Sequence, residues 1–477
     1  MAAGESAVAA LDAGVENTRF IVQISCVAAL GGFLFGFDSG VINGAIDGLK
    51  SAFQSGAVEV GFEAASLLLG CAAGAISAGR LADYWGRRVI LIVAAVLFLA
   101  SALGAGAALS ASWFITARVI GGLAVGAASI IAPAYIAEVA PARYRGRLAT
   151  VQQIAIISGL FCAFLSNFLI ARAAGVSTGT LWFHQAAWRW MFWVQGLPSA
   201  LFVISLLFIP ESPRFLVLSR RDREARAVLE RLYGPGRGSS KFAEISESLA
   251  GDRHRPRLSD LLVPGARRLR PIVWVGIGLA GLQQLVGINV IFYYGAVLWQ
   301  AVGFSESDAL LINVVSGALS VGACLIAIAL IDRVGRRPLL WVGSVGMTIT
   351  LVLIALAFSR SGLDAAQHVV LPHAAGIVAL VAANLYVIFF NMSWGPAMWV
   401  MLGEMFPNQI RGSSLAVTGG VQWIANFLVT VSFPVLLVGI GLDWTYALYA
   451  LAAVVSIVFV TRWVPETRGA ELEEMRG

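Results

Sequence analysis

The segment GRLADYWGRR, Gly79–Arg88, occurs a second time as LIDRVGRR at Leu330–Arg337. Two further loop segments recur in the same order: EVAPARYRG at Glu138–Gly146 as EMFPNQIRG at Glu404–Gly412, and PESPRF at Pro210–Phe215 as PETRG at Pro465–Gly469. Repeated segments in a fixed order are the sequence signature of a duplicated architecture. We therefore expect two related halves.

The segments between these loops are strongly apolar. Of the 477 residues, 58% are hydrophobic and 13% charged, against roughly 25% charged in soluble domains. Runs of about 20 apolar residues, enough to cross ~30 Å of hydrocarbon, recur along the chain. Twelve spans are predicted, at 20–46, 58–81, 89–110, 113–137, 148–171, 190–209, 271–300, 308–331, 338–359, 374–403, 412–438 and 444–463.

Six spans per half give both halves the same orientation, as in a parallel repeat about an axis along the membrane normal. The predicted fold class is an all-α membrane protein with twelve transmembrane helices in two six-helix bundles and short cytoplasmic helices between spans six and seven. The expected domains are an N-terminal tail (1–19), a first bundle (20–211), a helical linker (212–268), a second bundle (269–464) and a C-terminal tail (465–477).

The basic residues indicate topology rather than nucleic-acid binding. All but five of the 33 Lys and Arg residues fall in the termini and in loops on one side of the twelve-span arrangement. Basic loops remain cytoplasmic, so both termini are assigned to the cytoplasm. The five exceptions are Lys50, Arg172, Arg189 and Arg360 on the other side and Arg118 inside a span.

The sequence gives little support for an enzyme or for a metal site. The four cysteines lie inside spans without CxxC spacing, and the four histidines lie in loops or at span ends. No Ser–His–Asp set, Walker sequence or metal-ligand spacing is present. We expect no enzyme activity, cofactor or metal.

The repeated loops join acids to arginines. Such pairs hold helix ends together in one conformation and release them in another, although one exposed pair contributes only ~0–1 kcal/mol. The alternative is that they only enforce topology. The predicted cytoplasmic ion-pair network comprises Asp83, Arg87, Arg88, Glu138, Arg145, Glu211, Asp332, Arg336, Arg337, Glu404, Arg411 and Glu466.

Two charged residues lie within spans, Asp38 in the first and Arg118 in the fourth. An ion inside the membrane is costly, so it indicates function unless a partner is present. A pair that separates during a conformational change makes Asp38 a candidate proton carrier. The alternative is a static salt bridge that orients two helices.

The stretch GLQQLVGINVIFYY, Gly281–Tyr294, carries three carboxamides inside an apolar run. A carboxamide offers donor and acceptor without formal charge, which suits a ligand made of hydroxyl groups. Gln283 and Asn289 would not share a face of an ideal helix, but Gly287 permits a break. The alternative is that amides join helices to one another. The candidate polar set is Gln153, Gln283, Gln284, Asn289, Gln422 and Asn426, accompanied by the aromatic residues Phe35, Tyr293, Tyr294, Trp394, Trp399 and Trp423.

From about residue 20 to 470, the doubled DxxGRR and ExxPxxxRG loops resemble the major facilitator superfamily. PESPRF, QQLVGIN and PETRG resemble its sugar-porter branch, which holds bacterial proton:sugar symporters and animal glucose facilitators. The resemblance implies alternating access around a central sugar site. It assigns sugar contacts to Gln153, Gln283, Gln284, Asn289, Trp399 and Gln422, with Phe35 lining the site and Tyr293 and Tyr294 in the extracellular gate.

In proton-coupled members of the family an acid occupies the Asp38 position beside an arginine at the Arg118 position, so the resemblance favours symport. Leu160 replaces a glutamine of xylose carriers, which favours a hexose such as glucose. Further departures are Gln195 for a glutamate of some symporters, Ser320 for a frequent asparagine, and Tyr84 for a basic residue.

The sequence thus predicts a proton-driven monosaccharide importer of a bacterial inner membrane that acts as a monomer, with sugar, proton and lipid bilayer as partners and no nucleic acid. A facilitative uniporter, a non-transporting sugar receptor and a drug:proton antiporter are the alternatives.

Overall fold

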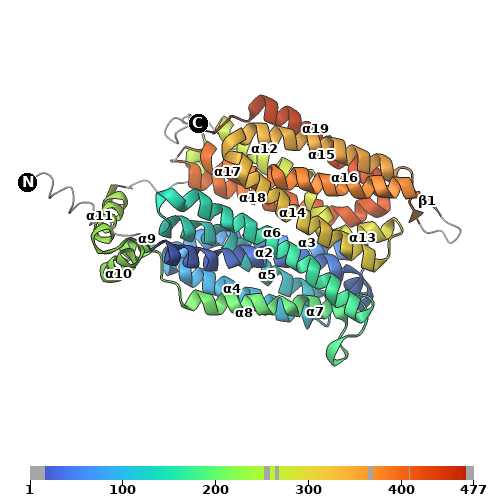
Figure 1. Cartoon of the computed structure of the whole chain (residues 1–477), viewed down its shortest axis with the longest axis horizontal. Helices are drawn as coiled ribbons and strands as arrows, with labels where there is room; N and C mark the ends of the chain where they lie inside the picture. Colours follow the sequence, from blue (N-terminus) through green and yellow to red (C-terminus); the bar gives the residue numbers. More distant parts are fainter. Residues whose placement is uncertain (1–16, 252–257, 264–267, 364–368, 408, 469–477) are drawn as a thin grey trace, which may run out of the picture.

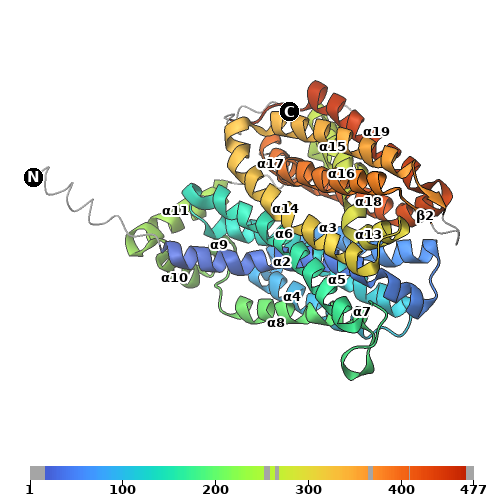
Figure 2. The same ribbon diagram turned by 45° about the vertical axis from the view of Figure 1, so that its right-hand side comes forward.

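Two helical bundles lie side by side, one made by each half of the chain (Figures 1 and 2). The computed structural model describes residues 17–251, 258–263, 268–363, 369–407 and 409–468. Within these residues, 12 helices or helix pairs are long and apolar enough to cross a membrane. The predicted twelve spans and the all-α class are confirmed.

The first bundle contains six spans, of which the sixth is divided into two helices. They are α2 (Thr18–Phe53), α3 (Ala57–Trp85), α4 (Arg87–Gly106), α5 (Ala111–Val139), α6 (Ala142–Ala174), and α7 (Ala187–Val194) with α8 (Gly196–Leu207). A single 3₁₀ turn, η1 (Trp182–His184), lies between α6 and α7.

The second bundle repeats this plan with two divided spans. Its helices are α12 (Pro271–Leu285) with α13 (Ile288–Ala301), α14 (Glu306–Val334), α15 (Arg336–Phe358), α16 (His373–Met392) with α17 (Trp394–Met405), α18 (Arg411–Gly439) and α19 (Gly441–Trp463). Two-residue strands, β1 (Gly362–Leu363) and β2 (Val369–Val370), pair antiparallel between α15 and α16.

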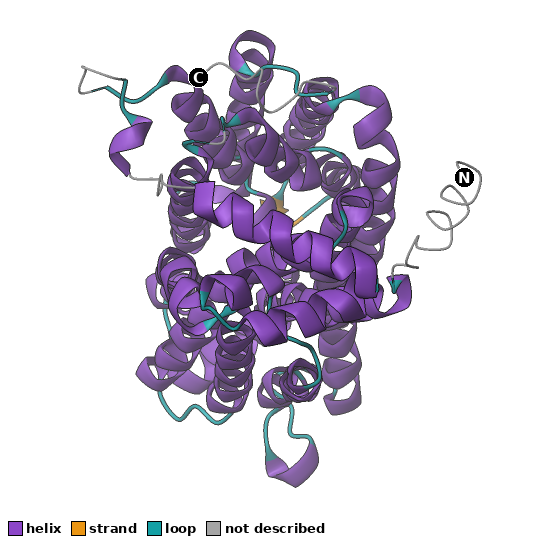
Figure 3. Ribbon diagram, turned by 90° about the vertical axis from the view of Figure 1, so that its left-hand side faces the viewer, coloured by secondary structure: helices purple, strands orange, loops and turns teal. Residues whose placement is uncertain are grey.

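Helix α2 begins and helix α19 ends at the same end of the molecule, here called the terminal face (Figure 1). Three short helices lie there across the ends of the bundles (Figure 3). They are α9 (Pro213–Leu218), α10 (Asp222–Tyr233) and α11 (Pro235–Gly251), followed by the 3₁₀ turn η2 (Leu258–Leu261). The other end of the molecule is called the opposite face.

Small residues allow the helices of the first bundle to approach closely. Along α2, glycines at four-residue spacing form one stripe against α6, comprising Gly32, Gly36, Gly40 and Gly44. A side chain at Gly36 would collide with the backbone carbonyl of Ile156. In membranes such close backbone contact replaces the hydrophobic effect as the source of helix association.

The outward surface is apolar, as a lipid-facing surface must be. On α8, Leu201 and Ile204 each expose 54% of their area, and on α19 Leu451 exposes 59%. Patches of this kind are rare on soluble monomers. The polar side chains are instead turned inward, where they form the site described next.

Candidate functional site

A break in the seventh span positions the central carboxamides. Helix α12 ends at Leu285, Gly287 takes a left-handed backbone conformation with φ of 83°, and α13 begins at Ile288. A side chain at Gly287 would lie 2.6 Å from the ring of Tyr449, so both the conformation and the space require glycine. The predicted break is therefore present.

The break brings Asn289 back toward the two glutamines that precede it. Asn289 Nδ2 donates to Gln284 Oε1 at 2.5 Å, and Gln284 Nε2 donates to Gln283 Oε1 at 3.1 Å. Gln422 Nε2 of α18 donates to the same Gln283 oxygen at 3.1 Å, while Gln283 Nε2 donates to the Trp394 carbonyl at 2.9 Å. We call Asn289, Gln284, Gln283 and Gln422 the amide chain.

The amide chain leaves hydrogen-bonding capacity unused. Gln422 Oε1 is buried and has no partner among the described residues. A buried polar atom without a partner is costly, and a hydroxyl from a ligand would satisfy it. Aromatic rings accompany the amides: Phe35 of α2 lies 5.7 Å from Trp423 between ring centroids, and Trp399 exposes 37% of its area. Amides and aromatic faces together fit a neutral, hydroxyl-rich ligand.

Not every predicted residue joins this arrangement. Gln153, on α6 of the first bundle, is half-buried, and no hydrogen bond is recorded for it within the described chain. The amide chain therefore belongs to the second bundle alone. Trp394 contributes its carbonyl, but its indole nitrogen donates to the Leu340 carbonyl and to Ser344 Oγ on α15.

The two predicted gate tyrosines are buried in α13, with exposures of 3% for Tyr293 and 1% for Tyr294. Tyr293 faces Ser39 of α2 and Asn426 of α18, so its hydroxyl lies between the bundles. Tyr294 donates its hydroxyl to the Thr430 carbonyl at 3.0 Å.

Asp38 and Arg118 form an ion pair between α2 and α5, and each side chain exposes only 1% of its area. Arg118 Nη1 donates to Asp38 Oδ1, and Nη2 donates to the Asp38 backbone carbonyl at 3.2 Å. The guanidinium lies over the Phe192 ring, 5.7 Å from its centroid. Asp38 Oδ2 has no recorded partner in the described chain, although the amide of Gln195 is adjacent. The predicted ion pair is therefore present.

A polar contact not predicted from the sequence joins the bundles on the opposite-face side. Asn43 Nδ2 of α2 donates to the Phe292 carbonyl at 2.8 Å. Its Oδ1 accepts from Ala296 N at 3.0 Å and from Asn313 Nδ2 at 2.9 Å. We call this contact the Asn43 clasp. In the sequence, the only sign of this contact is the carboxamide of Asn43, just over one helical turn beyond Asp38.

Two other interbundle hydrogen bonds support the clasp. Gln300 Nε2 donates to Asp47 Oδ2 at 2.7 Å, and Ser177 N donates to Glu306 Oε1 at 2.7 Å. The bundles are therefore held together on the opposite-face side.

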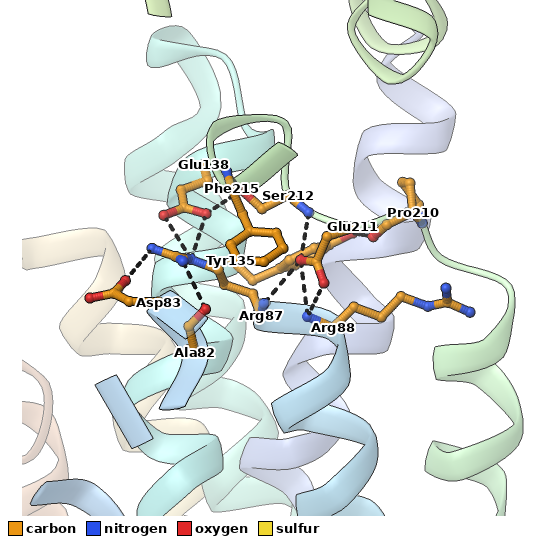
Figure 4. A network of polar contacts seen from close by, with 10 residues as sticks. All are labelled: Ala82, Asp83, Arg87, Arg88, Tyr135, Glu138, Pro210, Glu211, Ser212 and Phe215. Atoms are coloured by element: carbon orange, nitrogen blue, oxygen red, sulfur yellow. Dashed lines mark hydrogen bonds and ion pairs between the residues drawn. The ribbon is translucent and has the colours of Figure 1, made fainter. Parts of the chain in front are cut away.

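On the terminal face, the first DxxGRR loop builds the contacts shown in Figure 4. Arg87 pairs with Asp83 at 3.0 Å and with Glu138 at 3.2 Å. Glu211 accepts from the backbone N–H groups of Arg87 and Arg88 at 3.0 and 3.1 Å. The turn at Gly86, with φ of 100°, aims these N–H groups at the carboxylate.

The second loop reproduces this geometry. Arg336 pairs with Asp332 at 3.0 Å and with Glu404 at 2.9 Å. Glu466 accepts from Arg336 N at 3.1 Å and from Arg337 N at 3.0 Å, again beside a glycine, Gly335, with φ of 102°. The duplicated motif is therefore a duplicated structure.

Partial burial raises the pKa of Glu466, but backbone N–H donors outweigh burial, so the net pKa lies below its usual value. The donors are the N–H groups of Arg468, Arg336, Arg337 and Thr467. Hydrogen bonds to the charged form account for the direction.

These recorded ion pairs join helices of the same bundle. Ten of the twelve predicted network residues take part in the two clusters. Arg411 donates to the Phe406 carbonyl at 3.2 and 3.1 Å. The side chain of Arg145 lies outside the described residues.

Within the described chain, no group of three or more His, Cys, Asp or Glu residues could hold a metal ion.

Comparison with known proteins shows which family has this architecture. The family model described as "Sugar (and other) transporter" matches residues 24–477. The glucose transport protein of Synechocystis is 51% identical, covering 96% of this chain and 97% of the relative. The chain belongs to the sugar-porter family of the major facilitator superfamily.

More distant sugar porters extend the comparison. The D-xylose-proton symporter of Escherichia coli is 35% identical over 96% of each chain. A partially occluded inward-open structure of the E. coli xylose transporter XylE superposes with a TM-score of 0.80 and 32% identity, covering 94% of this chain and 100% of that one. The family and the fold are those of transporters rather than enzymes.

The structure shows the surroundings of Leu160 and Ser320, two residues at which this chain departs from the family's usual sequence. Leu160 is buried at 4% and packs against Gly40 of α2. Ser320 Oγ accepts from Asn391 Nδ2 at 3.3 Å and donates to the Ser316 carbonyl at 2.7 Å. The Ser320 hydroxyl therefore joins α14 to α16.

Proposed function

We propose that this sugar porter imports a monosaccharide together with a proton, by movement of the two bundles about a central sugar site. The amide chain, with its unpaired Gln422 oxygen, carries the sugar-binding half of the proposal. Hydroxyl groups of a sugar donate and accept in several directions, and neutral amides match both roles. A hexose such as glucose is the proposed substrate, supported by the glucose transport protein among the relatives.

The buried Asp38–Arg118 pair supports proton coupling. A lone ion inside a membrane is costly, and each partner offsets the cost of the other. The proposed coupling also requires α5 to shift relative to α2 within the first bundle, which parts Asp38 from Arg118 and lets the carboxylate take up a proton. The D-xylose-proton symporter among the relatives shows that the family includes proton-coupled members.

In the proposed cycle, protonated Asp38 permits sugar capture from the outside. The opposite face then closes through the Asn43 clasp and the gate tyrosines, and the ion-pair clusters on the terminal face rearrange. Sugar and proton leave toward the cytoplasm.

We further propose that the terminal face is cytoplasmic, because the predicted loops on that side hold nearly all basic residues. The proposed location is a bacterial inner membrane and the proposed unit is a monomer. The proposed domain limits are those predicted from the sequence: two bundles, at 20–211 and 269–464, joined by a linker.

The test compares Asp38→Asn with the wild type in liposomes. We expect Asp38→Asn to exchange labelled sugar across the membrane but to lose accumulation driven by a pH gradient. One proton per sugar gives about tenfold accumulation per pH unit, so the loss is large. Glu59→Gln, an exposed acid in the first turn of α3, is the matched control and should accumulate sugar normally. Accumulation by Asp38→Asn would show that Asp38 is not the coupling acid.

A facilitative uniporter is the second candidate, and absence of sugar-induced proton uptake by the wild type would favour it. A non-transporting receptor would bind sugar without exchanging it. A drug:proton antiporter would expel a cationic drug, for which the neutral amide chain offers no countercharge.

A further inference from the structure

Glu63 on α3 is a buried acid that the proposed function does not use. Its side chain exposes 1% of its area, as do those of Asp38 and Arg118. Asp38 and Arg118 pair with each other, whereas no cation is recorded beside Glu63 in the described chain. A buried carboxylate without a countercharge is unfavourable, so its surroundings decide its protonation state.

The two oxygens of Glu63 differ. Oε1 accepts a hydrogen bond of 2.6 Å from Ser55 Oγ, in the link between α2 and α3. Oε2 is buried with no partner in the described part of the chain. One position is therefore open to a proton.

Glu63 lies in the contact between the two bundles. Next to it in sequence, Gly61 lies against the carbonyl of Val431 on α18, and Phe62 meets Phe427 with 6.3 Å between ring centroids. We call this contact between α3 and α18 the seam. Tyr294 of α13 is also within reach of the Glu63 charge.

The charged and titratable groups around Glu63 do not supply a countercharge. On its own helix Glu59 adds a second negative charge. On α18 the sequence has no charged side chain between Arg411 and the helix end. On α5 Arg118 is committed to Asp38. On α2 Asp47 and Lys50 lie 3.7 Å from each other.

We infer that Glu63 holds a proton while the seam is closed and loses it to water when the seam opens toward the opposite face, so that pH on that face sets the balance between the two conformations. Opening admits water, which solvates the carboxylate, and the released proton passes to that water. A ligand that binds one state more tightly shifts the population toward that state. Here the proton is the ligand and the closed seam is the favoured state. Falling pH therefore closes the seam and rising pH opens it.

This inference rests on the proposed alternating access, but not on the identity of the sugar or on Asp38. The test uses sugar-free full-length protein in lipid nanodiscs. The four native cysteines are replaced by alanine, and spin labels are attached to Ser51→Cys on α2 and Ser307→Cys on α14, both exposed at the opposite face. Pulsed dipolar spectroscopy gives the fractions with short and long label distances between pH 5 and 8.

We expect the ratio of open to closed protein to rise with pH, by up to about tenfold per pH unit where Glu63 ionises. In Glu63→Gln, which resembles the protonated acid, the ratio should stay low and independent of pH. Glu59→Gln, the control one turn away, should keep the full pH response, with its midpoint moved to lower pH because a negative charge near Glu63 is removed. A pH response in Glu63→Gln equal to that of Glu59→Gln, or a wild type without any response, would overturn the inference.

A second variant decides the matter if Glu63→Gln does not fold. Ser55 and Glu63 lie in the same bundle, so their hydrogen bond should also stabilise the ionised carboxylate when the seam is open. Ser55→Ala removes this donor, which should favour the protonated closed form and move the midpoint of opening to higher pH. An unchanged midpoint would overturn the inference. Repeating the series with Asp38→Asn separates the two acids: loss of sugar accumulation tests Asp38, and the label distances without sugar test Glu63.

Discussion

Replacement of Asn43 by alanine should open the opposite face of this sugar porter. The Asn43 side chain exposes 1% of its area and makes three short hydrogen bonds, all to the second bundle, at 2.8, 3.0 and 2.9 Å. These bonds exist only while the bundles are in contact, because water replaces them when the face opens. At about 1 kcal/mol net for each bond, the closed state should lose about 3 kcal/mol relative to the open state, or roughly a hundredfold in the ratio of the two.

The measurement is the distance between labels at Ser51→Cys and Ser307→Cys, at a fixed pH and without sugar. Asn384→Ala is the matched control. Asn384 accepts from Ser316 at 2.8 Å and donates to the Leu380 carbonyl at 2.9 Å, both within the second bundle. Its loss should lower stability without changing the balance of conformations. Equal label distances in Asn43→Ala and Asn384→Ala would refute the assignment of the clasp as an interbundle lock.

Two further predictions concern the backbone break and the terminal face. Gly287→Ala should lower the free energy of unfolding by about 1–3 kcal/mol, because Gly287 has a left-handed φ. Gly281→Ala should not lower it, because the nearest atom to an added Cβ lies 4.0 Å away. Equal melting temperatures for the two variants would refute this prediction. The pKa of Glu466 lies below its usual 4.5 in the folded chain, so its stabilisation is present at neutral pH and is lost as the pH falls through that lowered pKa. The melting temperature of the wild type should therefore fall more than that of Glu466→Gln between neutral pH and about pH 3.5, and parallel curves would contradict the assignment.

The repeated loops were the most predictable part of the structure. A motif that needs glycine at a left-handed turn constrains both the backbone of the turn and the residue that the turn contacts. The turns at Gly86 and Gly335 agree within 2° in φ, at 100° and 102°. Each turn presents two N–H groups to a glutamate from the end of the same bundle, Glu211 or Glu466. Sequence order and local chemistry sufficed here because the contacts stay within one bundle.

The central site was predictable in part. Gln283, Gln284 and Asn289 come together because the seventh span breaks at Gly287, a residue at which the sequence permitted a break. Whether Gln153 meets them depends on the position of one bundle relative to the other, which is not encoded in local spacing. Its role as a sugar contact stays a prediction.

The interbundle polar residues could not be distinguished from ordinary buried ones. An asparagine inside an apolar helix has the same sequence signal whether it joins neighbouring helices or two bundles, as Asn43 shows. Glu63 lies less than two turns into α3, close in sequence to the polar residues Gln54 and Ser55 of the link between α2 and α3, and so resembles a residue at the membrane surface. Its burial becomes visible only when α18 is packed against α3.

The most direct test of the amide chain as the sugar site is the dissociation constant of glucose for Gln422→Ala, measured by isothermal titration calorimetry beside the wild type and Asn384→Ala. Loss of a hydrogen-bonding partner in a buried site costs about 1–3 kcal/mol, so Gln422→Ala should bind glucose roughly ten- to a hundredfold more weakly. Binding of Gln422→Ala at wild-type affinity would contradict the account.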